Sequence, residues 1–156
     1  MLSKGQILSS CELFKNVEPQ TLVRVAKFCK AMEAKPGEAI VVEEMAVDGL
    51  YIIAEGEVDY MKSMDEMSSL FLARRGPGDI FGFTSLFDNK GHLVTVIAVT
   101  PVNCLRIKSA DFFKICAEDP DFEHHVLEEM LIINSNYLRQ ITLRLREFLT
   151  KMLNNP

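Results

Sequence analysis

Short apolar segments separated by turn signals occupy residues 32–107, and this pattern constrains the fold more than any other feature. The apolar segments are 39–42, 50–54, 58–61, 70–73, 93–99 and 104–107. Seven turn signals separate them, at 36–37, 48–49, 55–56, 65–69, 76–79, 89–91 and 101–103. A turn about every ten residues is typical of an antiparallel sandwich or roll rather than an α/β fold. We therefore expect a mainly β fold with flanking helices, an antiparallel β-roll of the jelly-roll type with about eight strands.

Helical periodicity appears on both sides of this region. Apolar residues repeat at helical spacing after Pro19, which predicts a helix over 19–31. Ser109 is suited to cap a second helix through 110–117, and Asp119-Pro120 then interrupts the chain before a long helix from 121 to about 153. The sequence thus predicts two parts, a β-roll with its N-terminal helix over 1–120 and a C-terminal helix over 121–156.

The long helix carries an apolar seam whose members alternate four and three residues apart. The seam consists of Leu127, Leu131, Asn134, Leu138, Ile141, Leu145, Phe148 and Met152. An unbroken seam of this kind seeks a partner helix, and a polar Asn within it would specify register. A second stripe, Met130, Ile133 and Tyr137, is able to pack on the roll and leave the seam free. We therefore expect a parallel homodimer through this helix; packing of the seam on the roll and a higher oligomer remain alternatives.

Composition limits the classes of function. The 156 residues suit one domain with a helical tail, and no apolar run approaches the 18 or so residues that a membrane span needs. A net charge of −5 argues against binding of nucleic acid or an anionic membrane by this chain alone. The four cysteines form no C-x-x-C pair and lie beside apolar residues, which is typical of buried free thiols and of a reducing cytoplasm.

Catalytic and metal-binding patterns are weak in this sequence. His92 is the one histidine in the predicted roll, so a metal site there lacks ligands. His124 with Glu128, and His125 with Glu129, are i,i+4 pairs better explained as a solvated helix surface. No nucleophile elbow or Walker-type loop is present in the sequence. We expect no catalytic residues, no metal site and no enzyme.

The segment Phe81 to Val96, FGFTSLFDNKGHLVTV, joins a Gly, a hydroxyl-bearing turn and a loop to an apolar strand. It resembles the phosphate-binding cassette of the cyclic-nucleotide-binding domain family, roughly F-G-E-[LI]-[AS]-L followed by P-R-A-A-T-V. Five residues match that pattern: Phe81, Gly82, Leu86, Thr95 and Val96. Further landmarks of the family occur in the right order: Leu13-Phe14 before the first helix, Pro36-Gly37-Glu38, Leu50-Tyr51-Ile52-Ile53 and Gly56-Glu57-Val58.

The chain departs from the family at the two side chains that hold the ligand. The family Glu that accepts a hydrogen bond from the ribose is Phe83 here, and the family Arg that pairs with the phosphate is His92. Leu93 and Val94 stand where the family has small residues, and Glu44 stands where it commonly has Gly. An unpaired buried donor costs about 1–3 kcal/mol and a lost charge-assisted bond about 1.5–3 kcal/mol. Added together, these losses would weaken binding on the order of 10² to 10⁴-fold.

The resemblance implies a regulatory ligand-sensing module that acts as a homodimer and does not bind cyclic AMP in the ordinary way, or binds it only weakly. The residues expected to line any ligand site are Gly82, Phe83, Thr84, Ser85, Leu86, His92, Leu93, Val94 and Thr95. A ligand, if any, would be a cyclic nucleotide or another small anion, although bulky residues also favour a self-filled pocket or an apolar ligand. His92 would supply part of the charge when protonated, or it would simply face solvent. The alternative is a ligand-free scaffold, and either function leaves open an unknown downstream protein partner.

Overall fold

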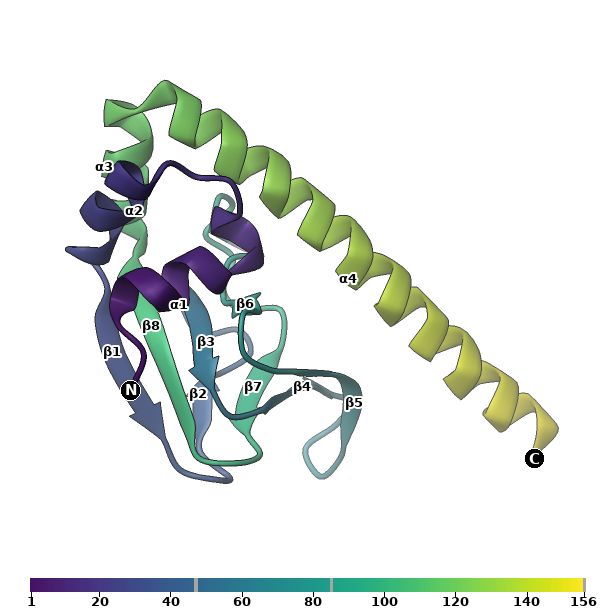
Figure 1. Cartoon of the computed structure of the whole chain (residues 1–156). Coiled ribbons are helices and arrows are strands. Elements are labelled where there is room, and N and C mark those ends of the chain that lie inside the picture. Colours follow the sequence, from purple (N-terminus) through teal and green to yellow (C-terminus); the bar gives the residue numbers. More distant parts are fainter. Residues whose placement is uncertain (47, 85, 156) are drawn as a thin grey trace.

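The computed structural model describes residues 1–46, 48–84 and 86–155 (Figure 1). Within these residues eight strands form two antiparallel four-stranded sheets, which confirms the predicted β-roll. The strands are β1 Lys30–Ala34, β2 Ala39–Val41, β3 Gly49–Glu55, β4 Val58–Ser63, β5 Ser69–Arg75, β6 Ile80–Phe81, β7 Thr95–Ala98 and β8 Val102–Lys108. The helices are α1 Lys4–Ser10, η1 Glu12–Phe14, α2 Pro19–Ala26, α3 Ser109–Glu118 and α4 Pro120–Asn154.

The two sheets have the strand orders β1-β8-β3-β6 and β2-β7-β4-β5. Strand β3 shows why they enclose two apolar regions. Successive side chains in a strand point to opposite faces, so Tyr51 and Ile53 face the second sheet, while Leu50 and Ile52 face the helices. The helices α1, α2, α3 and the start of α4 cover this outer face at one end of the roll (Figure 1). Burial on both faces explains the continuous apolar run in β3.

Among the boundaries that differ from the sequence prediction, two lie at the helices. The helix predicted over 19–31 ends at Ala26, because residues 30–34 instead pair with β8, from Lys30 opposite Arg106 to Ala34 opposite Val102. Ser109 is not the N-cap of α3: Lys108 occupies that position, and Ser109 is the first helical residue. Neither boundary alters the order of the elements.

Helix α4 matches the predicted long helix closely. Pro120 occupies its first turn, and the Asp119 side chain caps it by accepting a hydrogen bond from the Phe122 N–H at 3.0 Å. The stripe of Met130 and Ile133 is buried against the roll, as predicted. The C-terminal half of α4 runs past β5 and projects beyond the body of the roll (Figure 1). None of the helices in the described residues has the length and apolar character needed to cross a membrane.

Candidate functional site

The predicted cassette forms the connection between β6 and β7. Gly82 begins it with φ +80°, and a side-chain carbon there would lie 3.0 Å from the Tyr51 ring and 3.2 Å from the Gly49 carbonyl oxygen. Only glycine suits this close and left-handed position. The chain then turns, with the Leu86 N–H donating a hydrogen bond to the Phe83 carbonyl at 3.0 Å. This turn directs the Phe83 side chain inward.

Phe83 is 1% exposed and joins the core that lies beneath the helices. Its ring centroid lies 6.1 Å from that of Tyr137 on α4, a separation at which aromatic rings attract. A buried aromatic ring offers no acceptor for a ribose hydroxyl. The position that holds the family's Glu therefore contributes packing between the cassette and α4.

His92 is also buried, with 6% of its surface exposed, so the alternative of a solvent-facing histidine is wrong. The reason lies in the segment before β3, which folds against the cassette. The His92 N–H donates to the Met45 carbonyl at 3.0 Å, and the Glu44 N–H donates to the His92 carbonyl at 2.9 Å. Burial lowers the pKa of the imidazole, an effect that the Asp48 carboxylate opposes. A neutral imidazole lacks the charge that would attract a phosphate.

Glu44 adopts φ +67°, a conformation that is uncommon for residues other than glycine. This geometry accounts for the glycine that the family commonly has at the position, since a glycine adopts it without strain. The neighbouring Gly91 has φ +89°, and a side-chain carbon there would lie 2.6 Å from the Glu44 carbonyl oxygen. Close main-chain contact between these two turns thus holds the segment over His92.

The space left between these groups is small. A cavity of about 20 Å³ remains, which holds about one water molecule. Among the predicted ligand-binding residues, those that line it are Gly82, Phe83, Thr84, His92, Leu93 and Val94. Leu86 lies instead in the core beneath the helices, and the Thr95 hydroxyl accepts a hydrogen bond from the Glu43 N–H. Ser85 lies outside the described residues.

Tyr137 closes the cavity from the side of α4, a role that its sequence position does not reveal. Its hydroxyl donates to the Ile80 carbonyl at 2.9 Å, and the Tyr60 hydroxyl donates to the same carbonyl at 3.1 Å. The Arg75 guanidinium lies 4.4 Å from the centre of the Tyr137 ring. Burial raises the pKa of Tyr137 to about 12, so the hydroxyl remains a donor. The sequence signal available was only the stripe that it shares with Met130 and Ile133.

An ion pair fixes the far side of the cassette. Lys62 on β4 pairs with the Glu43 carboxylate and also donates to the Leu93 carbonyl at 3.2 Å. The same carboxylate accepts a hydrogen bond from the Ser63 N–H at 3.0 Å, and the bond from Lys62 is the main reason why the pKa of Glu43 is lowered. The cassette loop is therefore held to β4 as well as to α4.

A larger groove of about 300 Å³ runs along the boundary between the roll and α4. Leu93, Val94, Leu138 and Ile141 give it a mainly apolar lining. It borders the filled cavity, since Thr84, Leu93 and Tyr137 line both. This groove is where the alternative of an apolar ligand finds space.

The predicted dimer seam lies mostly on the surface. Leu131, Leu138, Ile141, Leu145 and Met152 are exposed, and Asn134 and Phe148 are half-buried. Leu127 differs from the rest because it packs half-buried against the chain's own core. The exposed part of the seam therefore begins at Leu131.

Comparison with known proteins gives one family. A family model described as "Cyclic nucleotide-binding domain" matches residues 31–119, more than half of the chain. The CRP-like cAMP-activated global transcriptional regulator of Mycobacterium tuberculosis is 25% identical over 122 residues, which cover 78% of this chain and 54% of that protein. The chain thus spans about half the length of this curated relative.

Solved structures show the same fold. The catabolite activator protein of Thermus thermophilus superposes with a TM-score of 0.74 and 22% identity, over 88% of this chain and 62% of that one. The regulatory domain of Toxoplasma gondii PKA, crystallised with cAMP, gives a TM-score of 0.74 and 19% identity, over 86% of this chain and 49% of that one.

Proposed function

Because the chain belongs to the cyclic nucleotide-binding domain family, we propose that it is a regulatory module whose own side chains occupy the family's ligand pocket. It acts as a homodimer and does not bind cyclic AMP or cyclic GMP in the usual way. The observation that carries this proposal is the cavity of about 20 Å³ between Phe83, His92 and Tyr137. Pockets that hold small organic ligands have about 300 Å³ or more.

Charge supports the same conclusion. The buried His92 imidazole has a lowered pKa and is neutral near pH 7, so a cyclic phosphate would enter without a cationic partner. Burial of an unpaired charge is among the costliest events in a protein interior. Phe83 in turn provides no acceptor for a ribose hydroxyl. Both losses weaken the binding of a cyclic nucleotide, as the lack of space does.

The built-in contacts suggest how such a module works. In a sensor, a ligand changes the packing of the cassette against the helix and so shifts the population of conformations. Here Phe83 and the bond from Tyr137 to Ile80 supply that contact permanently. The module would then hold α4 in one arrangement and present a constant dimer surface to a downstream protein.

The dimer is proposed on the exposed part of the seam. Apolar residues at the four-three spacing from Leu131 to Met152 are exposed or half-buried, and helices with such a stripe associate to bury it. Asn134 within the stripe favours a defined register. The four cysteines are free and buried, which supports a reducing compartment such as the cytoplasm.

Calorimetric titration with cyclic AMP and cyclic GMP tests the proposal. We expect no binding to the natural chain at ligand concentrations up to about 100 μM, well above the micromolar range. A triple variant, Phe83→Glu, His92→Arg and Tyr137→Ala, restores the acceptor, the charge and the space, and we expect it to gain measurable affinity. His92→Arg alone is the control, since the cavity stays filled. Micromolar binding by the natural chain would refute the proposal.

The regulatory module could respond to a different small ligand or to none, and in the second case it is a ligand-free scaffold, which the filled cavity also favours. A thermal shift screen of nucleotides and small anions separates the two, because a ligand that binds the native state raises its apparent stability. If no compound raises the apparent stability and sedimentation shows an intact dimer, the result favours the scaffold. A stabilising compound favours a sensor with a different ligand, for which the 300 Å³ groove offers room.

A further inference from the structure

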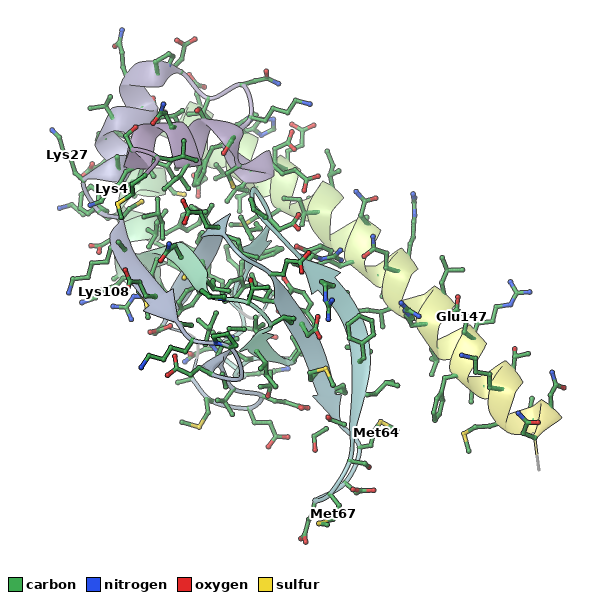
Figure 2. The ribbon with its side chains drawn as sticks, turned by 60° about the horizontal axis from the view of Figure 1, so that its bottom comes forward. Lys4, Lys27, Met64, Met67, Lys108 and Glu147 are labelled. Carbon is green, nitrogen blue, oxygen red and sulfur yellow. The ribbon has the colours of Figure 1, made fainter. Side chains whose placement is uncertain are left out.

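Arginines from two elements line a groove between β5 and α4 that shares no lining residue with the filled cavity. Arg74 and Arg75 come from the end of β5, and Arg144 comes from the part of α4 that runs past this strand. The groove has a volume of about 320 Å³. Glu147 also lines it, and Figure 2 shows this residue on the C-terminal half of α4.

The guanidinium groups in this groove are held in place by neighbouring side chains. Arg75 lies 4.4 Å from the ring centre of Tyr137 and donates a hydrogen bond to the Gln140 side chain. Arg144 lies 5.3 Å from the ring centre of Phe71. Planar guanidinium groups stacked on aromatic rings lose little further freedom when they bind a ligand. The donors are therefore pre-organised.

The positive charge in the groove is only partly balanced. Arg74 forms a two-point ion pair with Asp59 at 2.8 and 3.0 Å, and Arg144 lies 3.3 Å from Glu147. Arg75 makes no ion pair within the described part of the chain, and its buried Nε has no hydrogen-bond partner there. The positive charge of Arg75 is thus left without a carboxylate partner in the described residues, and an anionic ligand would supply one.

We propose that this groove binds a phosphate-bearing small molecule. Arginine suits phosphate because its fork of N–H donors bonds two oxygens at once. The floor formed by Leu72, Ala73 and Leu143 is apolar and accommodates an organic portion next to the phosphate. The volume lies within the range of small-molecule sites. The site is additional to the filled family pocket, and its existence does not depend on that pocket being filled.

The groove is compatible with the proposed dimer. At about 100° per residue around the helix, Glu147 lies about 160° from Leu145 of the seam. A partner helix packed along the seam would therefore leave the Glu147 side of the groove open to solvent, while Arg144, about 40° from Phe148 of the seam, would lie at its border.

Calorimetric titration of the full chain with inorganic pyrophosphate at low ionic strength tests the site. We expect saturable binding that Arg144→Gln weakens about 10-fold, the loss expected for one charge-assisted hydrogen bond. Glu147→Gln should strengthen binding several-fold, because it removes the carboxylate that competes for Arg144. The matched control is Arg146→Gln, since this arginine lies about 160° round the helix from Arg144 and does not line the groove, so the change should alter affinity less than about twofold.

Adenosine triphosphate forms the second arm of the experiment. If adenosine triphosphate binds with a lower dissociation constant than pyrophosphate, and Leu143→Ser removes this difference, the result supports an organic ligand seated on the apolar floor. Equal constants support the phosphate site with no contact from the nucleoside. The proposal is overturned if pyrophosphate does not bind at millimolar concentration, or if Arg146→Gln weakens binding as much as Arg144→Gln. Neither result bears on cyclic-nucleotide binding by the filled pocket, which the triple variant tests separately.

Discussion

The hydroxyl of Tyr137 lies 2.9 Å from the main-chain carbonyl oxygen of Ile80 and donates a hydrogen bond to it. Tyr60 donates to the same oxygen from the opposite sheet. One carbonyl at the start of the cassette therefore connects α4 to the interior of the roll. Ile80 lies two residues before Gly82, so this contact ties the filled pocket to the position of the helix.

Removal of the Tyr137 hydroxyl should destabilise the fold modestly. We expect Tyr137→Phe to lower the free energy of unfolding by about 1 kcal/mol, the net contribution of one such hydrogen bond. Tyr60→Phe should cost a similar amount, because either hydroxyl can still satisfy the carbonyl. The double variant should cost more than the sum of the two, since the buried oxygen then loses both donors. Urea denaturation of the four proteins measures this coupling, and simple additivity would contradict it.

The proposed dimer depends on the exposed seam. Leu145→Glu would place two unpaired carboxylates in the helix interface, and we expect the dimer dissociation constant to rise by about 100-fold or more. Thr150→Glu is the matched control, because it adds the same charge to the same helix on the side away from the seam. Analytical ultracentrifugation of both variants checks the result. Equal weakening by the two would show that the seam is not the interface.

His92 should make stability depend on pH. Burial holds the pKa of the folded-state imidazole below its ordinary value of 6.5, so below that pH the unfolded chain binds a proton that the folded chain does not. Stability is therefore complete above about pH 6.5 and falls as the pH drops through the lowered folded-state pKa. Urea denaturation of the natural chain and of His92→Gln should show a steeper fall for the natural chain. If stability fell equally steeply with pH in both proteins, the pH dependence could not be assigned to His92.

Much of this architecture was predictable, because it follows from local signals. Turn residues at regular spacing specify a roll, and the apolar period of α4 specifies its length and its buried stripe. Strand β1 was not predictable in the same way. The helical spacing of Val25 and Cys29 continues past the true end of α2, and only pairing with β8, some 70 residues later, converts residues 30–34 into a strand.

The candidate site likewise combines features that the sequence reveals with features that it does not. The loss of the ribose and phosphate partners is visible at Phe83 and His92 without coordinates. The burial of His92 is not, because it results from main-chain bonds to Glu44 and Met45, almost 50 residues away. Tyr137 is recognisable as a roll-facing residue, yet its bond to Ile80 spans 57 residues. Contacts between distant segments are decided by tertiary packing, which residue spacing does not report.

The close contact between the two turns over His92 should tolerate no side chain at Gly91. We expect Gly91→Ala to lower the free energy of unfolding by about 1–3 kcal/mol, since the position has φ +89° and a side-chain carbon would lie 2.6 Å from the Glu44 carbonyl oxygen. Gly5→Ala in α1 is the control: it meets nothing closer than 3.9 Å and should be neutral or stabilising by about 0.5–1 kcal/mol. Thermal denaturation of both variants provides the comparison.

Helix α4 continues without a break from the buried stripe to Asn154, so a tilt about Tyr137 that also released Gln140 from Arg75 and Arg144 from Phe71 would move its far end most. The stretch from Tyr137 to the end of the helix is about 25 Å long at 1.5 Å per residue. A tilt of only about 5° at Tyr137 would displace the tip by about 2 Å. Any event that releases these contacts is thus amplified at the far end of the helix.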